Sequence, residues 1–371
     1  MKKIGLIINP IAGIGGKVGL KGSDGADTYK RALTLGAVPE CGQKVLAALR
    51  ELQSIQDEFE IYTYSGSMGE EICKEAGLNF RIAGQPEHAL TFPEDTKRAA
   101  RKIIDMGVDL LVFAGGDGTA RDIMDAVGME VPVLGIPAGC KIHSGVYAVN
   151  PTAAGRLLCR YIQGKAKETA EAEVMDIDEE LFREGIVQAR LYGYLNVLKE
   201  QGFVQNRKSG GSMQTDSVEA IADYLADLWE EDVLYIVGTG STTAAVMKRM
   251  GLENTLLGVD LVYRKQVIAK DCTEQEILEN IEKYDKVKIL VTVIGGQGYI
   301  FGRGNQQISA EVIRRTGREN IIVAAAKEKM LLLQGKPLYV DTGNPEIDSV
   351  LSGYIRVIVG YKEIMIAKVS N

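Results

Sequence analysis

The sequence predicts an α/β protein of two domains, and three observations lead to this. The chain has 371 residues, which is more than one hydrophobic core usually serves. Short apolar runs alternate with helical patterns, as in βαβ units with a doubly wound parallel sheet. Many of the 42 glycines follow the apolar runs, where βα loops lie. We expect a first domain at 1–165 and a second, α/β or β-rich, at 166–371. The last strands either stay in the second domain or return to the first. We expect a ligand cleft between the two domains.

The first half carries the clearest succession of strands and helices. A helical pattern opens at Pro39, and Thr91 and Glu94 have the spacing of a capping box ahead of a second helix. A helix over 152–163 closes the unit, and the polar stretch 165–173 is interpreted as a connector. Strands are expected at 4–8, 59–63, 80–83, 110–114 and 133–137.

The second half alternates in the same way. Helices are expected at 244–250 and 273–283, and the polar, glycine-rich stretch 205–216 is predicted to be a mobile loop. Strands are expected at 233–237, 287–294, 321–325, 354–359 and 364–369.

Composition excludes several functions. A net charge of −7 disfavours general binding to nucleic acid or to anionic membranes, because both require a positive field. Five scattered cysteines and two histidines provide neither a zinc site nor a disulfide framework. The chain begins directly with an apolar strand pattern and has no run long enough to span a bilayer. A cytoplasmic location is therefore expected.

The most informative segment is Gly115-Gly116-Asp117-Gly118-Thr119, directly after the buried strand at 110–114. Ligands of open parallel sheets bind at the carboxyl ends of strands, and glycine lets backbone N–H groups approach phosphate oxygens. A helix expected from about Ala120 would point its positive end at the same anion. Asp117 could hold Mg²⁺ on the phosphates or accept a proton from an attacking hydroxyl. The alternative is a tight turn in which Asp117 caps the helix.

These residues resemble the signature of the superfamily that joins NAD kinases with diacylglycerol and sphingosine kinases. Asn9-Pro10-Ile11-Ala12-Gly13 is similar to its Asn-Pro-x-x-Gly motif. Further stretches are similar to those of the ATP-NAD kinase-like branch and extend the resemblance over most of the chain. They lie at 19–25, 94–96, 136–144 and 301–307.

The resemblance implies a phosphotransferase that uses ATP and Mg²⁺ and phosphorylates NAD at the ribose 2′-hydroxyl. Asp117 would be the essential carboxylate, and Asn9, Gly115, Gly116, Gly118 and Thr119 would line the nucleotide phosphates. Relatives generally form homo-oligomers, so a homo-oligomer is expected. Two alternatives stay open: a nucleotide-binding regulatory protein with little catalysis, and a kinase for a sugar or lipid. The acidic composition disfavours a membrane lipid.

A second polar loop follows the strand expected at 233–237. Gly238, Gly240, Ser241 and Thr242 resemble the Thr-Gly-Ser-Thr motif of NAD kinases and, equally, the phosphate loop of ribose-5-phosphate isomerases. Backbone amides and hydroxyls are good neutral donors to phosphate. The alternative is a plain helix cap by Ser or Thr.

Some polar residues in these stretches are candidates for substrate binding. Arg303 could donate two hydrogen bonds to a phosphate, and His143 could orient a substrate or shuttle a proton. Ordinary ion-pair or hydrogen-bonding roles are the alternatives. The full set of candidates is Lys21, Asp24, Lys141, His143, Arg303 and Asn305.

The sequence departs from the family in two respects. NAD kinases carry an Asn-Glu or Asn-Asp pair for the NAD ribose, and Asn196-Val197 lacks the acid. The resemblance also implies a β-sandwich in the second half, whereas the pattern between residues 231 and 330 indicates alternating strands and helices.

Overall fold

A computed structural model describes residues 1–20, 26–88, 90–140, 142–177, 189–200, 215–294 and 297–370. The chain forms two compact units. The first contains the described residues within 1–14, 22–34 and 38–207, and the second those within 15–21, 35–37 and 208–371. Each unit has its own mixed sheet with helices, so the predicted α/β class is confirmed.

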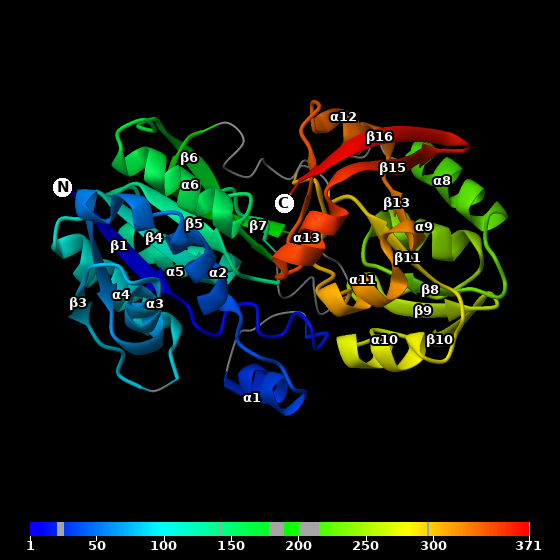
Figure 1. The fold of residues 1–371 in the computed structure, drawn as a ribbon, viewed down its shortest axis with the longest axis horizontal. Coiled ribbons are helices and arrows are strands. Elements are labelled where there is room, and N and C mark those ends of the chain that lie inside the picture. The colour runs from blue at the N-terminus through cyan, green and yellow to red at the C-terminus, as the bar shows by residue number, and fades with distance from the viewer. Residues whose placement is uncertain are drawn as a thin grey trace. The chain divides into compact units, whose positions relative to one another are not determined.

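The first unit is built on a seven-stranded sheet in the order β3-β2-β1-β4-β5-β7-β6 (Figure 1). All neighbours run parallel except β6 and β7, which are antiparallel. Five of the strands lie where the sequence predicts them. The bounds are β1 Lys2–Ile8, β2 Phe59–Tyr64, β3 Phe80–Gly84, β4 Leu110–Gly115, β5 Val133–Pro137, β6 Thr169–Ile177 and β7 Ala189–Leu198.

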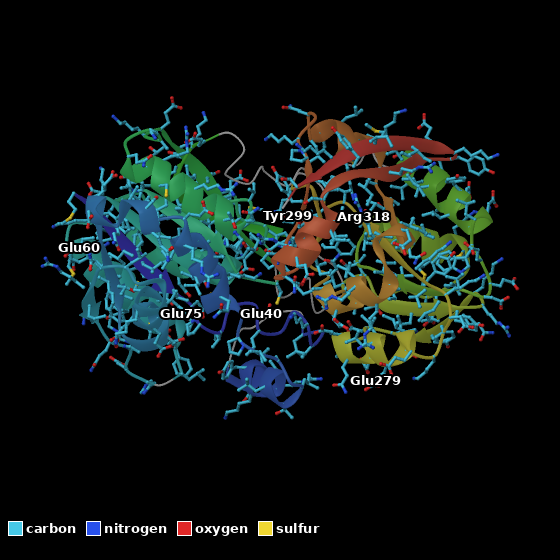
Figure 2. All side chains as sticks on the ribbon, viewed as in Figure 1. Glu40, Glu60, Glu75, Glu279, Tyr299 and Arg318 are labelled. Carbon is cyan, nitrogen blue, oxygen red and sulfur yellow. The ribbon has the colours of Figure 1, made fainter. Side chains whose placement is uncertain are left out.

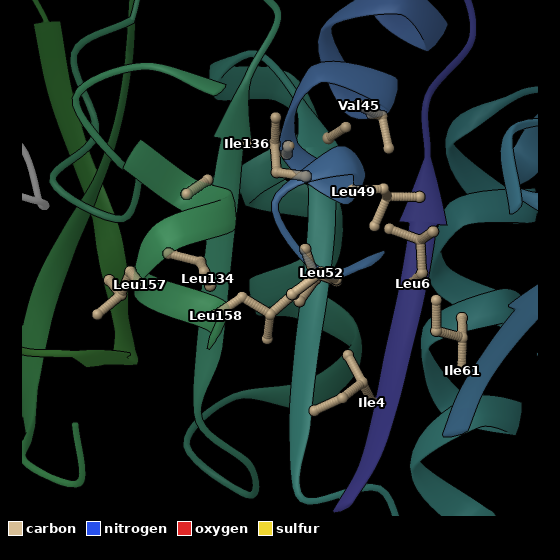
Figure 3. Packing of buried hydrophobic residues seen from close by; sticks show 14 of the residues in the cluster. Ile4, Leu6, Val45, Leu49, Leu52, Ile61, Leu134, Ile136, Leu157 and Leu158 are labelled. Atoms are coloured by element: carbon tan, nitrogen blue, oxygen red, sulfur yellow. The ribbon is translucent and has the colours of Figure 1, made fainter. Parts of the chain in front are cut away.

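Helices cover both faces of this sheet, as a doubly wound fold requires. One face packs against α2, α3 and α6, and the other against α4 and α5. Figure 3 shows the first of these layers, where Leu49 of α2 and Leu158 of α6 lie over Leu6 of β1 and Leu134 of β5. The bounds are α1 Ala26–Thr34, α2 Cys41–Arg50, α3 Glu70–Ala76, α4 Pro93–Asp105, α5 Asp117–Val127 and α6 Pro151–Ile162, with short 3-10 helices at Gln53–Glu58 and Gly66–Met68.

Helix α4 begins with a cap one residue later than the sequence indicates. The expected pair was Thr91 and Glu94, but Phe92 is the N-cap and the carboxylate of Asp95 accepts its backbone N–H at 3.0 Å. Asp95 also accepts the N–H of Glu87 at 3.2 Å. Pro93 at the first helical position fixes the boundary, since proline suits a position whose N–H has no helical partner.

The stretch 165–173 is not simply a connector, because strand β6 begins at Thr169. It pairs with β7 along nine positions, from Thr169 with Leu198 to Ile177 with Ala189. Val174 is buried while Glu171 is exposed, as expected of a sheet edge with one solvated face. The charged face of this strand concealed it in the sequence.

The second unit is built on a nine-stranded sheet in the order β10-β9-β8-β11-β13-β15-β16-β14-β12 (Figure 1). Its central strands β8, β11, β13 and β15 are parallel. The last two strands, β15 and β16, pair in this sheet and do not return to the first. The bounds are β8 Leu234–Val237, β9 Asp260–Tyr263, β10 Gln266–Ala269, β11 Val287–Thr292, β12 Tyr299–Phe301, β13 Ile321–Ala324, β14 Leu338–Val340, β15 Gly353–Gly360 and β16 Glu363–Ser370.

Helices also lie on both faces of this second sheet. The core on one face includes α8 and α9, and the core on the other includes α10, α11, α12 and α13. The alternation predicted between residues 231 and 330 is confirmed, and the β-sandwich implied by the resemblance is wrong. The bounds are α8 Thr215–Asp227, α9 Ser241–Arg249, α10 Glu274–Ile281, α11 Ala310–Thr316, α12 Lys327–Leu332 and α13 Pro345–Leu351, with a 3-10 helix at Arg318–Asn320. Residues 205–214 of the predicted loop 205–216 lie outside the described residues, and α8 begins at Thr215.

One segment from the beginning of the chain belongs to the second unit. Residues 15–20 form a turn closed by the N–H of Leu20 on the carbonyl of Gly15 at 2.9 Å. The carbonyl of Lys17 accepts the N–H of Glu274, at the start of α10, at 3.0 Å. Gly19 has a φ of +71°, which only glycine adopts readily.

The cysteines are unpaired in the structure. All five cysteines carry free thiols. Burial raises the pKa of Cys41 and of Cys73 to about 12. Within the part of the chain that the structure describes, every helix is too short or too polar to cross a membrane.

Candidate functional site

The Gly115–Thr119 segment is a strand end followed by the first turn of a helix. Gly115 is the last residue of β4, Gly116 is the N-cap, and α5 begins at Asp117, three residues earlier than expected. Asp117, Gly118 and Thr119 therefore lie in the first helical turn, whose N–H groups have no carbonyl partner within the helix. The helix N-terminus favours negative charge there.

The glycines of this segment allow close contact between two βα connections. A Cβ on Gly139, which follows β5, would lie 2.6 Å from the Cα of Gly116. A Cβ on Gly115 would lie 2.3 Å from the Thr119 hydroxyl. The backbone N–H groups of Ala138 and Gly139 both donate to the carbonyl of Gly115 at 2.9 Å. These contacts require small residues whether or not a phosphate binds.

Asp117 lies at the centre of a buried hydrogen-bond network, with only 5% of its surface exposed. One carboxylate oxygen, Oδ1, accepts the backbone N–H of Ser144 at 3.0 Å. The other, Oδ2, accepts the backbone N–H of His143 at 2.7 Å and lies 3.0 Å from Nδ1 of the His143 ring. The structure therefore brings together Asp117 and His143, which the sequence singled out separately.

Asn9 also joins this group. It follows β1, which lies beside β4 in the sheet. Its side-chain amide donates to the Thr119 hydroxyl at 2.9 Å, and its backbone N–H donates to the carbonyl of Ala114 at 3.0 Å. Two predicted phosphate-binding residues therefore lie in contact at the carboxyl ends of neighbouring parallel strands.

Sequence reasoning missed an ion pair close to Asp117. Arg121, one turn further along α5, donates to Asp176 at the end of β6 at 3.0 Å and stacks on the Tyr192 ring at 4.1 Å. Burial raises the pKa of Asp176, and the negative charge of Asp117 raises it further. The spacing of Arg121 four residues after Asp117 was a usable signal. Asp176 gave none, because no strand was predicted there and the stretch 165–173 just before it was interpreted as a connector.

The second glycine-rich loop, in the second unit, has the same form as the first. Gly238 follows β8, Gly240 is the N-cap with a φ of +126°, and α9 begins at Ser241. The Thr239 hydroxyl donates to the carbonyl of Gly304 at 3.2 Å, which joins this loop to the one after β12. Thr242 is fully buried.

The remaining candidates have different surroundings. Asn305 holds its own loop, because it accepts the N–H of Gly302 at 3.1 Å and donates to the carbonyl of Ile300 at 2.9 Å. Arg303 is 3% exposed and lies over the ring of Tyr299, with Cζ 4.8 Å from the ring centroid. Lys21, Asp24 and Lys141 lie outside the described residues.

The arrangement does not fit a magnesium ion held by the protein alone. Both oxygens of Asp117 already accept hydrogen bonds from protein N–H groups, and Asp176 is paired with Arg121. Among the described residues, no three His, Cys, Asp or Glu side chains converge on a point that could hold a metal. In phosphotransfer sites Mg²⁺ is usually held by one or two carboxylates together with the phosphates of the substrate and water.

Comparison with known proteins covers nearly the whole chain. Residues 4–166 match the model of the ATP-NAD kinase N-terminal domain, and residues 206–369 match that of the ATP-NAD kinase C-terminal domain. Among curated proteins, no sequence matches the chain.

Two solved structures illustrate the structural comparison. A conserved domain protein from Vibrio cholerae O1 biovar El Tor is 12% identical, with 89% of this chain and 75% of that chain covered and a TM-score of 0.24. The UDP-GlcNAc 2-epimerase of Methanocaldococcus jannaschii, in complex with UDP-GlcNAc and UDP, is 15% identical, with 97% and 89% covered and a TM-score of 0.25. At these scores neither structure supports a conclusion.

Proposed function

This chain belongs to the ATP-NAD kinase family and is an ATP-dependent kinase that phosphorylates NAD, and we propose that its Asp117–His143 pair activates the acceptor hydroxyl. The observation that carries the proposal is the 3.0 Å contact between Oδ2 of Asp117 and Nδ1 of His143, inside a buried network. An aspartate at Nδ1 selects the tautomer whose Nε2 is free to accept a proton.

The phosphates of ATP would lie at the start of α5, beside Asn9 and Thr119. Free N–H groups of the first helical turn and the helix dipole favour a polyphosphate there. The hydrogen bond between Asn9 and Thr119 holds both side chains in place. Phosphoryl transfer needs mainly positioning of the reactants and stabilisation of charge. A phosphate-binding helix N-terminus and one proton acceptor are therefore sufficient for this reaction.

In the proposed step, the acceptor hydroxyl of the NAD ribose gives its proton to Nε2 of His143. Its oxygen forms a bond to the γ-phosphorus as the bond from that phosphorus to the bridging oxygen breaks, which releases ADP. The carboxylate of Asp117 stabilises the imidazolium that forms. Asp117 is then the positioning residue and His143 the proton acceptor.

The experiment compares NADP formation from ATP and NAD by the wild type, His143→Gln, Asp117→Asn and His88→Gln. A general base contributes about 10²–10⁴-fold, so both site variants should lose kcat on this scale with a small change in KM for ATP. His88 is exposed and lies outside the network, so His88→Gln should keep wild-type kcat. Circular dichroism checks that each variant is folded.

The outcomes separate two forms of the mechanism. If His143→Gln kept wild-type kcat while Asp117→Asn lost it, Asp117 itself would receive the proton and the role given to His143 would be wrong. If Asp117→Asn kept wild-type kcat, the site would lie elsewhere in the chain.

Three finer points complete the proposal and rest on the family resemblance. The hydroxyl is the ribose 2′-hydroxyl, which phosphorus NMR of the product distinguishes from the 3′ position. Mg²⁺ enters as the ATP complex, so excess chelator should abolish turnover. The chain forms a homo-oligomer in the cytoplasm, and light scattering of the purified protein gives the number of copies.

A further inference from the structure

The second unit contains a buried arginine whose guanidinium lacks hydrogen-bond partners. Arg303 is only 3% exposed, and none of its three guanidinium nitrogens has a hydrogen-bond partner of ordinary geometry among the described residues. The guanidinium lies over the ring of Tyr299, whose position is labelled in Figure 2. A buried cation without an acceptor is costly in free energy, because removal from water is not repaid by new hydrogen bonds.

The surroundings of Arg303 include a buried phenol that keeps its proton. The charges of Asp341 and Arg303 act in opposite directions on the phenol of Tyr299. Burial raises the pKa of the Tyr299 phenol well above its usual value, although the charge of Arg303 acts in the opposite direction. Tyr299 therefore stays protonated and can donate a hydrogen bond. Its hydroxyl is buried and also lacks a partner of ordinary geometry.

Other neutral donors lie where α9 begins and where β11 ends. The hydroxyls of Thr242 and Thr292 are buried without hydrogen-bond partners among the described residues. A Cβ on Gly240 would lie 2.5 Å from a methyl carbon of Thr292, so the start of α9 touches the end of β11. The hydrogen bond from Thr239 to Gly304 brings the residue after Arg303 to this loop.

We propose that Arg303 is the centre of an oxyanion site in the second unit that takes a phosphate group. The planar guanidinium offers paired N–H donors that match two phosphate oxygens, and phosphate would supply the acceptors that the free protein lacks. This inference does not depend on the proposed roles of Asp117 and His143, which lie in the first unit. A phosphate ester of a nucleotide and free phosphate share the chemistry, so the experiment includes both.

The experiment measures binding of radiolabelled inorganic phosphate to the full chain by equilibrium dialysis. Arg303→Met keeps the length of the side chain but removes the charge, and should bind one equivalent less under conditions that saturate the wild type. Arg303→Lys keeps the charge but loses the paired donors, so its affinity should fall about tenfold to a hundredfold. Competition by ADP and by NADP then tells whether the phosphate of a nucleotide or free phosphate is the better ligand.

Two controls make the result specific. Arg314→Met removes one charge from the exposed face of α11 in the same unit, where Arg314 pairs with Glu311, and should leave phosphate binding unchanged. Asp117→Asn should also retain the equivalent that depends on Arg303. Phosphate binding at Arg303 can therefore be confirmed even if the proposed proton transfer by Asp117 and His143 is wrong.

The sign of the stability change is a second readout. Because Arg303 has no acceptor in the free protein, Arg303→Met should raise the melting temperature without ligand and should abolish the part of the phosphate-induced rise that depends on Arg303. Undiminished phosphate binding by Arg303→Met would overturn the proposal. If that variant does not fold, undiminished affinity in Arg303→Lys would overturn it equally.

Discussion

At Gly139 the backbone of one βα connection touches the backbone of another, and this contact holds the proposed phosphate site together. A methyl group there would lie 2.6 Å from the Cα of Gly116, and neither partner is a flexible side chain that can move aside. We expect Gly139→Ala to destabilise the protein by about 1–3 kcal/mol, the usual cost of overpacking. Urea unfolding measures the change.

The control is Gly145→Ala, in the same stretch of chain. A Cβ on Gly145 would lie 3.7 Å from the Cβ of Ala172, which is ordinary van der Waals contact. This variant should change stability by less than about 0.5 kcal/mol. Equal destabilisation by the two variants would show that the contact between Gly139 and Gly116 is not the cause.

Single residues could be picked out of the sequence, but their partners could not. The segment around Asp117 stood out because glycines follow a buried strand, and Asn9 stood out at the end of another. The hydrogen bonds that join Asp117 to His143, 26 residues along the chain, depend on how the connection after β5 folds back over α5. Asp176 carried no signal, since its contact with Arg121 exists only once β6 has paired with β7.

Among the helices, α4 depends on a single buried carboxylate at its beginning. Asp95 is 2% exposed and accepts the backbone N–H groups of Phe92 and Glu87, as well as a guanidinium N–H of Arg98 at 2.7 Å. Asp95→Asn should cost about 1–2 kcal/mol, because charged caps of this kind contribute on that scale and an amide cannot accept all three bonds. Thermal unfolding measures the loss.

The pH dependence of this effect has a definite sign. Burial raises the pKa of Asp95, but the N–H donors and the nearby Arg98 outweigh burial, so the pKa in the folded protein is lowered. The stabilisation is therefore fully present above the pKa of the unfolded chain, about 3.9, and is lost as pH falls through the folded value. The difference between wild type and Asp95→Asn should be constant from about pH 7 to pH 5 and shrink below about pH 4.

Asp105, the last residue of the same helix, provides the matched control. It is exposed, and a negative charge at a helix C-terminus opposes the dipole. Asp105→Asn should therefore leave stability unchanged or raise it by a few tenths of a kcal/mol. A loss as large as that of Asp95→Asn would mean that general charge, rather than the cap, stabilises α4.

Elements buried on both faces were predictable, whereas a charged edge strand and the shortest strands were not. The apolar runs of β4 and β5 match their observed bounds to within one residue, because such runs have few alternatives. Strand β6 was not predicted because the charged residues Glu171 and Glu173 lie in its first half and interrupt the apolar pattern. The short strands β12 and β14 were missed because three residues show no periodicity.

For the whole molecule, the alternation of strands and helices correctly predicted two α/β units. The sequence did not reveal that the chain contributes to the second unit before it completes the first. Residues 15–20 lie between β1 and the rest of the first unit in sequence, yet they contact α10 of the second. Their assignment depends on contacts with residues more than 250 positions away, which no local pattern encodes.

This arrangement predicts that damage near the N-terminus loosens the second unit. Gly19 has a φ of +71° and no atom within 3.5 Å of where its Cβ would be, so Gly19→Ala introduces backbone strain without a clash. The strain should cost about 1–2 kcal/mol. Hydrogen exchange should then accelerate at the amide of Glu274, which donates to Lys17, and in the start of α10.

Gly107→Ala is the matched control, because Gly107 has a φ of +72°, has nothing within 4 Å of its Cβ position and follows α4 in the first unit. The strain is the same, but faster exchange should appear around the end of α4 and leave α10 unchanged. If Gly19→Ala instead accelerated exchange in β1 and β4, the turn at 15–20 would be part of the first unit's cooperative core. The turn would then open together with the first unit, which is adjacent to it in sequence, and not with α10, which it contacts. Hydrogen exchange makes this distinction because it reports which contacts open together.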